Sequence, residues 1–241
     1  MQQIIDSIVG GSRIRNVIVH ATPGAGKSSL PIIASKLIQA GKADKICWIC
    51  PRMSLQDQAE RNYIDPFFRE MFHHELAIRS STNEPDPSRG LSGFVTTYQA
   101  IGQDKDETVL HELAKRRYIL VLDEFHHAEA DEGAWTKALW PIYDAAKYRV
   151  LMTGTLERGD EKKIAFVDYD AGLRPVLQSD DQTAVIRYTR GDALADRAII
   201  PLVFQFLDGH AKWETQDGRT KQARLSSAYG QDASHALYTA L

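Results

Sequence analysis

Apolar residues along this chain gather in short continuous runs, and amphipathic stretches with helical spacing separate these runs from one another. The runs are predicted to be strands, at Asn16–His20, Lys45–Cys50, Gly93–Thr97, Tyr118–Leu122 and Arg149–Thr153, with a short one at Glu75–Ile78. Helices are predicted at Ser28–Gln39, at Ser54–Phe72 with a break at Pro66, at Thr108–Arg116 and at Trp135–Ala146. The alternation predicts an α/β fold in which a mostly parallel sheet carries helices on both faces.

The pattern changes after about Leu156, where charged and polar residues become more frequent. One more strand is predicted at Thr183–Tyr188. Beyond it, Asp208-Gly209 stands between two runs of alternating character, 199–207 and 210–215, and this arrangement is a strong hairpin signal. Residues 223–241 carry a weak helical pattern that stops without a cap, as in a cut chain. We therefore expect one lobe over residues 1–198 and a hairpin with a helical strap over residues 199–241.

The net charge of the 241-residue chain is −3, so the chain as a whole is not a basic nucleic-acid coat. Nucleic-acid binding would need a local basic patch or a partner domain. No apolar run approaches the roughly 20 residues of a membrane-spanning helix. The first residues also lack the basic and apolar segments of a signal peptide. We expect a cytoplasmic protein that makes no membrane contact.

The cysteine and histidine pairs are the candidates for a structural zinc site. Cys47 and Cys50 lie three residues apart in a predicted strand, so their side chains should point to opposite faces of the sheet. One pair of thiols also cannot complete a tetrahedral zinc site. The pairs His73-His74 and His126-His127 do not occur in a zinc-binding motif. We expect neither a disulfide nor a structural zinc ion.

A phosphate-binding loop is predicted directly after the first strand. The segment reads Ala21-Thr22-Pro23-Gly24-Ala25-Gly26-Lys27-Ser28, which is the pattern G-x-x-x-x-G-K-[ST] with alanine in the first position. Glycines let successive backbone N–H groups turn toward phosphate oxygens, and the following helix adds its N-terminal dipole. Lysine is expected to reach the β- and γ-phosphates of ATP, and Ser28 to ligate Mg²⁺. The expected nucleotide-binding residues are Thr22, Pro23, Gly24, Ala25, Gly26, Lys27, Ser28 and Ser29.

The second half of the predicted site follows the apolar strand at Tyr118–Leu122. Asp123 and Glu124 come directly after it, at the carboxyl end where such sheets bind ligands. Asp123 is expected to hold the Mg²⁺ shell, and Glu124 to polarise the attacking water as a general base. Two solvated loop carboxylates would be the simpler explanation if no phosphate loop were present. With that loop, Lys27, Asp123 and Glu124 are the predicted catalytic residues.

Three further segments, in this chain order, resemble motifs of superfamily 2 helicases, including type III restriction motor subunits and DEAD/DEAH-type relatives. Pro51–Gln58 is similar to motif Ia, Thr96–Gln99 to motif Ib, and Thr153-Gly154-Thr155 to motif III. Asp123-Glu124-Phe125-His126 is then a D-E-x-H form of motif II. The resemblance covers about residues 1–156 and implies the first RecA-like lobe of an ATP-driven motor. It implies nucleic-acid backbone contacts from Arg52, Thr96, Thr97 and Gln99, and nucleotide coupling through His126, Thr153, Gly154 and Thr155.

The resemblance also implies a partner lobe. Motors of this superfamily close ATP between two RecA-like lobes, and arginines of the second lobe stabilise the transferring phosphate. No segment of this chain resembles those arginine motifs, so the second lobe would belong to a longer protein, with DNA or RNA as the track. Two alternatives remain open at this point: a P-loop ATPase or kinase of another class, and a non-catalytic interaction module that retains the fold.

Overall fold

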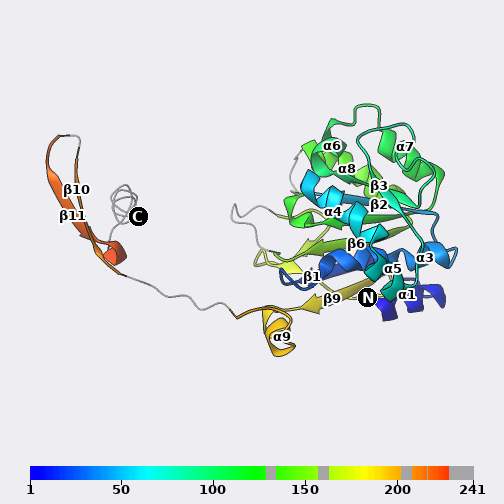
Figure 1. Cartoon of the computed structure of the whole chain (residues 1–241), viewed down its shortest axis with the longest axis horizontal. Coiled ribbons are helices and arrows are strands. Elements are labelled where there is room, and N and C mark those ends of the chain that lie inside the picture. Colours follow the sequence, from blue (N-terminus) through cyan, green and yellow to red (C-terminus); the bar gives the residue numbers. More distant parts are fainter. Residues whose placement is uncertain (129–133, 157–162, 202–207, 216, 228–241) are drawn as a thin grey trace. The chain divides into compact units, whose positions relative to one another are not determined.

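The computed structural model describes residues 1–128, 134–156, 163–201, 208–215 and 217–227 (Figure 1). The chain forms two compact units, residues 1–199 and residues 200–241. The first unit is built around a sheet of seven strands in the order β3-β4-β2-β5-β6-β1-β9, and every neighbouring pair is parallel. The strands are β1 Asn16–Ala21, β2 Lys45–Cys50, β3 Ile78–Ser80, β4 Gly93–Thr97, β5 Tyr118–Asp123, β6 Tyr148–Thr153 and β9 Thr183–Tyr188. The expected α/β fold is confirmed.

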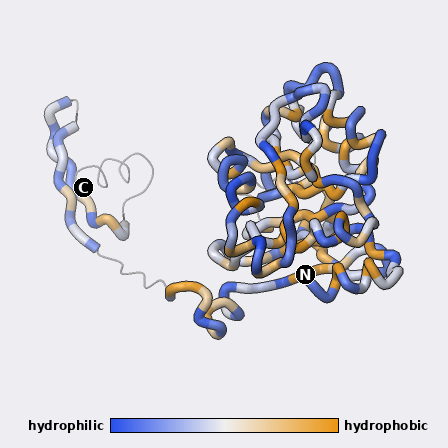
Figure 2. Tube along the Cα trace, turned by 45° about the vertical axis from the view of Figure 1, so that its right-hand side comes forward, coloured by the Kyte–Doolittle hydropathy of each residue, from blue (hydrophilic) through white to orange (hydrophobic). Residues whose placement is uncertain are grey.

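Helices cover both faces of this sheet because successive side chains of each strand point to opposite sides. One apolar core forms between the sheet and the early helices, which are α1 Gln2–Val9, α2 Leu30–Ala34, α3 Lys36–Gln39, α4 Met53–Ile64 and α5 Pro66–Phe72. The other core forms against α6 Tyr98–Gln103, α7 Thr108–Lys115 and α8 Ala134–Ala145. The strands therefore lie between two apolar layers, and the apolar segments gather inside the lobe (Figure 2).

Strand β2 shows this alternation in the two cysteines. Cys50 belongs to the core beneath α1–α5, whereas Cys47 belongs to the core beneath α6–α8. Both thiols are free, and both are buried. Burial raises the pKa of the Cys50 thiol to about 12, so it stays protonated at neutral pH. The expectation that the two side chains lie on opposite faces is confirmed.

The helices differ from the expected ones after the phosphate loop and after β4, and the break expected at Pro66 is confirmed. The stretch after the phosphate loop begins as a short 3-10 turn at Lys27–Ser29 and continues as α2 and α3, which Gly41 follows with a φ of 67°. The expected helix at Ser54–Phe72 is two helices, because Pro66 begins α5 and Asp65 caps it. Helix α6 was not predicted; it begins directly after β4, where the Thr97 side chain accepts a hydrogen bond from the Ala100 N–H.

The hairpin predicted around Asp208-Gly209 is not tested, because residues 202–207 of its first strand lie outside the described residues. The observed hairpin pairs β10 His210–Glu214 with β11 Thr220–Arg224, so its turn lies between Glu214 and Thr220. The chain contains a second Asp-Gly pair there, and Gly218 takes the positive φ of 76° that such a turn requires. Asp208 instead accepts hydrogen bonds from Ser226. The expected strand at 199–207 and helix at 223–241 lie largely outside the described residues, and Ala223 and Arg224 belong to β11.

The remaining elements follow β6 along the chain. Short strands β7 Asp168–Tyr169 and β8 Pro175–Val176 pair antiparallel. Helix α9 Arg190–Ala195 follows β9 and begins with a capping box made by Thr189 and Asp192. Short 3-10 turns occur at Phe125–His127 and Leu225–Ser227. Among the described residues, no helix is both long and apolar enough to cross a membrane.

Candidate nucleotide-binding site

The loop between β1 and α2 has the backbone conformation of a phosphate cradle. Gly24 and Gly26 have φ values of 83° and 73°, in the left-handed region that side chains with a Cβ rarely adopt. A Cβ on Gly26 would meet no atom within 4 Å, so backbone conformation and not space is what requires glycine there. The loop stands at the carboxyl edge of the sheet, since β1 ends at Ala21.

Four amides of this loop are open. In the described part of the chain, the N–H groups of Gly24, Gly26, Lys27 and Ser28 donate to no acceptor, whereas Ala25 donates to the Thr22 carbonyl and Ser29 to the Gly26 carbonyl. Open N–H groups at a glycine-rich turn before a helix form a binding site for anions. The donor set therefore fits a nucleotide phosphate.

Lys27 is held toward the carboxylates at the end of β5. Its Nζ donates to the Ala21 carbonyl at 3.0 Å and lies 3.5 Å from the Glu124 Oε1. The side chain is only 11% exposed, so its charge faces the site. Alanine at the first position of the loop is compatible with this arrangement, because the lysine donates its hydrogen bond to the backbone carbonyl of Ala21 and not to a side chain.

Asp123 and Glu124 differ in their surroundings. Burial, together with the neighbouring charge of Glu124, raises the pKa of Asp123 to about 6, although Lys27 acts in the opposite direction. The Asp123 carbonyl accepts a hydrogen bond from the Tyr98 hydroxyl at 3.0 Å. Glu124 has a φ of 48°, which turns the chain sharply at the end of β5. The structure thus keeps one carboxyl buried and presents the next one beside Lys27.

The end of β6 closes the third side of the site, because β6 lies between β5 and β1 in the sheet. The Gly154 N–H donates to Glu124 Oε2 at 3.2 Å. The Thr153 hydroxyl lies 3.3 Å from the same oxygen and 2.8 Å from the His126 Nδ1. A Cβ on Gly154 would come within 3.2 Å of the Lys27 Nζ. These three strand ends therefore bring Lys27, Glu124, His126 and Thr153 together.

The sequence of this lobe matches a family model. Residues 1–158 match the type III restriction enzyme res subunit, and this stretch is more than half of the chain. The chain belongs to this family. The match and the all-parallel sheet support the RecA-like ATP-binding lobe that the superfamily 2 motifs predicted, and the comparisons give no support to a kinase or to a P-loop ATPase of another class.

Individual proteins show the same relationship. The chain is 29% identical over 221 residues to an uncharacterised protein, Rv2917, of Mycobacterium tuberculosis strain ATCC 25618 / H37Rv, and 28% identical over 220 residues to one, ML1624, of Mycobacterium leprae strain TN. Each alignment covers 89% of this chain but 34% of the relative, so the chain spans about a third of those proteins.

Two solved structures share the fold. The Hef helicase domain of Pyrococcus furiosus matches with a TM-score of 0.50 at 16% identity, over 80% of this chain and 39% of that one. A nuclease-deletion mutant of the Type ISP restriction-modification enzyme LlaGI, in complex with a DNA substrate mimic, matches with a TM-score of 0.51 at 18% identity, over 82% of this chain and 20% of that one.

The residues of motifs Ia and Ib fall into two groups in this res-family lobe. Arg52 and Gln99 are exposed. Thr96 is 1% exposed, and its hydroxyl has no hydrogen-bond partner among the described residues. Thr97 is 9% exposed, and its hydroxyl caps α6. The side chains of Thr96 and Thr97 therefore do not lie on the surface, and Arg52 and Gln99 are the two candidates placed to reach a backbone phosphate.

Two residues at the site were not predicted from the sequence. His20 on β1 lies in register with Thr153 on one side and Arg187 on the other. Burial, with the charge of Arg187 next, lowers the pKa of His20, so it is neutral at pH 7. Tyr98 anchors the end of β5, as described above. Both stand at ordinary strand or helix positions, so only the pairing of the strands reveals them.

The buried carboxyl of Asp123 predicts a change in stability. A carboxyl whose folded pKa is raised destabilises the folded state above that pKa, and the cost disappears below the unfolded value near 4. We expect Asp123→Asn to raise the stability of the nucleotide-free chain by about 1 kcal/mol at pH 7.5, or about 2–4 °C, with no gain near pH 4. Thermal unfolding in a chelating buffer at both pH values measures this. A loss of stability at pH 7.5 would contradict it.

Proposed function

We propose that this lobe binds Mg-ATP at the P-loop and that the protein to which it belongs couples ATP hydrolysis to movement on nucleic acid. The observation that carries the proposal is the convergence of the open amides of the loop, Lys27 and Glu124 at the carboxyl edge of one sheet. Nucleotides bind at this edge in doubly wound folds. Membership of the res-subunit family supports ATP hydrolysis as the reaction.

Each group has a distinct role in this proposal. The loop from Thr22 to Ser29 holds the phosphates through its amides, and Lys27 neutralises their charge. Ser28 and Asp123 would hold Mg²⁺, which when bound screens the charge of the phosphate oxygens. Glu124 orients a water molecule and accepts its proton. His126, Thr153, Gly154 and Thr155 link Glu124 to the nucleic-acid side of the lobe.

The track and the second half of the motor are also part of the proposal. Arg52 and Gln99 contact backbone phosphates of DNA or RNA, since a contact of this kind positions the strand without reading its sequence. Residues 199–241 lead toward a second RecA-like lobe in the full-length protein. The much greater length of the mycobacterial relatives is consistent with such a lobe.

The nucleotide site is tested most directly by removing the Lys27 amine. We expect Lys27→Ala to weaken the binding of a fluorescent ATP analogue by about 10- to 100-fold, because a charge-assisted contact with phosphate contributes about 1.5–3 kcal/mol. Lys105→Ala, at an exposed lysine in the loop between α6 and α7, is the matched control and should bind as the unmodified chain does. Equal affinities for all three proteins would overturn the assignment.

A further inference from the structure

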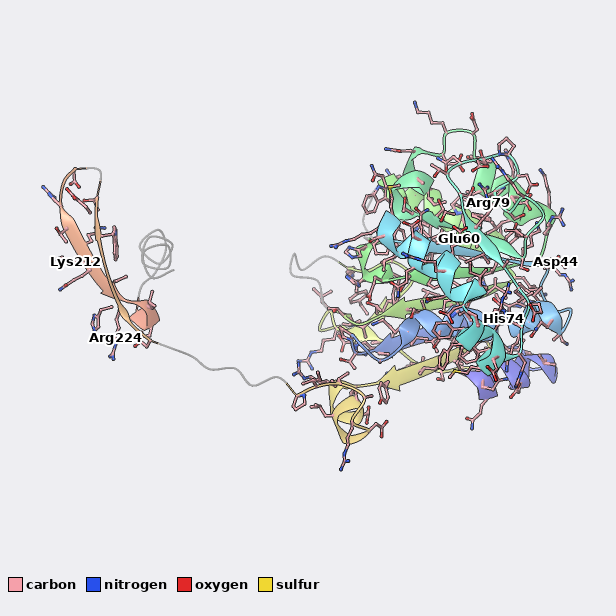
Figure 3. The ribbon with its side chains drawn as sticks, in the orientation of Figure 1. Asp44, Glu60, His74, Arg79, Lys212 and Arg224 are labelled. Carbon is pink, nitrogen blue, oxygen red and sulfur yellow. The ribbon has the colours of Figure 1, made fainter. Side chains whose placement is uncertain are left out.

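A basic hollow lies at the amino-terminal edge of the sheet, opposite the edge that holds the P-loop. Its volume is about 590 Å³. It is formed where β1, β2, β5 and β6 begin and where α7 and α8 end. Asp44, which precedes β2, marks this edge in Figure 3, and α9, which follows the carboxyl end of β9, lies at the other side of the sheet in Figure 1. The side chains that line the hollow include six cations and only two carboxylates.

Two of these cations have carboxylate partners. Arg117 pairs with Asp44 at 2.5 Å and also donates to the Gly41 carbonyl. Arg116 lies 3.4 Å from Glu112. The negative charge of Asp44 is therefore paired with Arg117, and these contacts fix the position of the loop that leads into β5. They leave Asp144 as the one other carboxylate that lines the hollow.

The other four cations have no carboxylate partner in the described part of the chain. Arg149 donates to the Tyr143 carbonyl at 2.6 Å, to the Asp144 carbonyl at 3.1 Å and to Asn16, and its guanidinium lies 4.5 Å from the centre of the Tyr143 ring. Asp144 acts on it electrostatically but forms no ion pair with it. Arg15, Lys115 and Lys147 form no ion pair among the described residues. One carboxylate, Asp144, therefore faces four cations that form no ion pair among the described residues.

The ends of α7 and α8 do not remove this excess. Lysine near a helix C-terminus interacts favourably with the negative end of the helix dipole, which explains part of the preference for Lys115 and Lys147. Each helix end contributes only about half a negative charge, however. Asp144 and two helix ends thus balance about two of the four charges. Arg15 precedes β1 and has no helix end behind it.

The cations also follow a line along the sheet edge. Lys147 and Arg15, which form no ion pair among the described residues, precede β6 and β1, and Arg117, which is paired with Asp44, precedes β5; these three strands are consecutive in the sheet. Neighbouring strands are about 4.8 Å apart, so the row spans roughly 10 Å. The phosphates of one strand of a duplex repeat about every 3.4 Å along its axis, so the row has the length of about three nucleotides. A row of cations suits a phosphodiester backbone better than a single anion.

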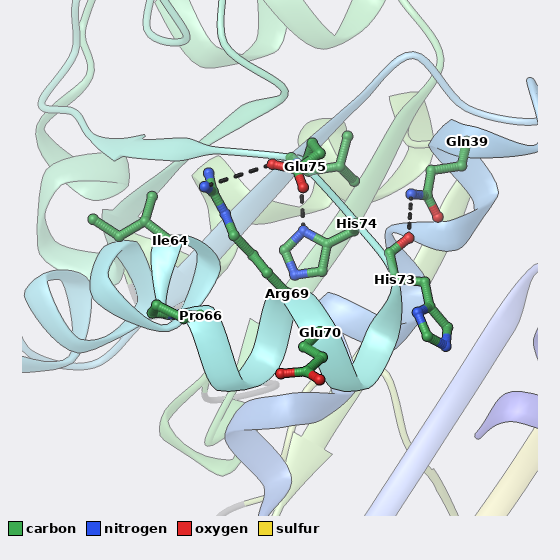
Figure 4. A pocket seen from close by; sticks show the side chains of 9 residues that line it. Gln39, Ile64, Pro66, Arg69, Glu70, His73, His74 and Glu75 are labelled. Carbon is green, nitrogen blue, oxygen red and sulfur yellow. Dashed lines mark hydrogen bonds and ion pairs between the residues drawn. The ribbon is translucent and has the colours of Figure 1, made fainter.

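A second large hollow, beside α5, differs in the balance of its charges. It holds Arg69, Glu70, His73, His74 and Glu75 among its lining residues (Figure 4). Arg69 pairs with Glu75 at 3.6 Å, and Gln39 donates to the His73 carbonyl, so the one arginine of this hollow has a carboxylate partner. An excess of uncompensated positive charge thus distinguishes the hollow at the amino-terminal edge.

We propose that this amino-terminal edge binds the phosphodiester backbone of a nucleic-acid duplex, as a second contact distinct from Arg52 and Gln99. The proposal extends the proposed function, from which it takes nucleic acid as the partner. In a chain of net charge −3, a local concentration of cations is what permits such binding. The contact would be independent of base sequence and sensitive to salt.

The test compares two triple variants of the 241-residue chain. Arg15→Gln/Lys115→Gln/Lys147→Gln removes three cations of the hollow, and Lys105→Gln/Arg174→Gln/Arg190→Gln removes three exposed cations elsewhere. Binding of a short labelled DNA duplex is followed by fluorescence anisotropy between about 50 and 200 mM salt. We expect the first variant to bind at least about 10-fold more weakly at low salt, with a salt slope smaller by up to roughly 3, at about 0.9 per phosphate contact. The control should bind as the unmodified chain does.

Three results would overturn the proposal. The first is equal loss in both triple variants, which would show a general charge effect. The second is unchanged duplex binding by the hollow variant while Arg52→Gln weakens it, which would leave the proposed function intact. The third is competition for the hollow by an acidic peptide but not by the duplex, which would identify a protein partner. Binding of an ATP analogue, measured on the same samples, tests the proposed nucleotide site independently of the hollow.

Discussion

The 241-residue chain should bind Mg-ATP but hydrolyse it about 10³–10⁵-fold more slowly than the full-length protein does with nucleic acid. The described part of the lobe supplies amides, a lysine and two carboxylates to the site. Arg187, which pairs in register beside His20, donates to the Leu177 carbonyl. We propose that the arginine that neutralises charge on the transferring phosphate comes from the second lobe. Its absence costs about 4–7 kcal/mol of transition-state stabilisation.

Phosphate release by the chain and by the full-length protein, each with and without DNA or RNA, measures this difference. Nucleic acid should stimulate the full-length protein and leave the chain almost unchanged. Adding the remainder of the protein in trans should restore part of the rate if the lobes can assemble. Hydrolysis by the chain alone at several turnovers per second, about the ordinary range for a complete enzyme, would show that one lobe holds a complete site.

The core of the fold could be predicted from the sequence because its strands are buried on both faces. Such strands are rich in apolar residues, and the fully buried β2 and β4 begin and end at the predicted residues. The edge strand β9 is only partly buried, and its β-branched residues gave its bounds correctly as well. Helix α6 could not be predicted in this way, since it follows β4 with no intervening turn residue. The observed hairpin was missed for a different reason: Asp208-Gly209 and Asp217-Gly218 carry the same local signal, and only the pairing of β10 with β11 shows a turn at the second.

In the candidate site, too, features that depend on adjacent residues could be predicted, whereas contacts between distant segments could not. Groups adjacent in the chain, such as Gly24–Ser28 and Asp123-Glu124, are recognised by their spacing. The contacts of Glu124 with Lys27 and Gly154 depend on the strand order β5-β6-β1, which joins segments about a hundred residues apart in the sequence. Burial of Thr96 is likewise a consequence of the position of β4 inside the sheet, and the motif itself does not show it.

Glu124→Gln should lower the rate of ATP hydrolysis by the full-length protein about 10²–10⁴-fold, because the amide cannot accept a proton from water. The glutamine keeps the length of the side chain, and its carbonyl oxygen can still accept the hydrogen bond from the Gly154 N–H. Glu107→Gln is the matched control, since Glu107 is an exposed glutamate with a nearly identical φ of 49° against 48° at Glu124. Its rate should be unchanged.

Nucleotide affinity distinguishes a general base from a structural role for Glu124. Glu124 Oε1 lies 3.5 Å from the Lys27 Nζ and therefore competes with phosphate for the lysine. Removing the negative charge frees Lys27 and lessens repulsion toward the nucleotide, so Glu124→Gln should bind ATP as tightly as the unmodified protein or more tightly. Equilibrium binding of an ATP analogue, measured beside the hydrolysis rate, gives both quantities. If affinity and rate fall together, Glu124 maintains the shape of the site and the water is activated by another group.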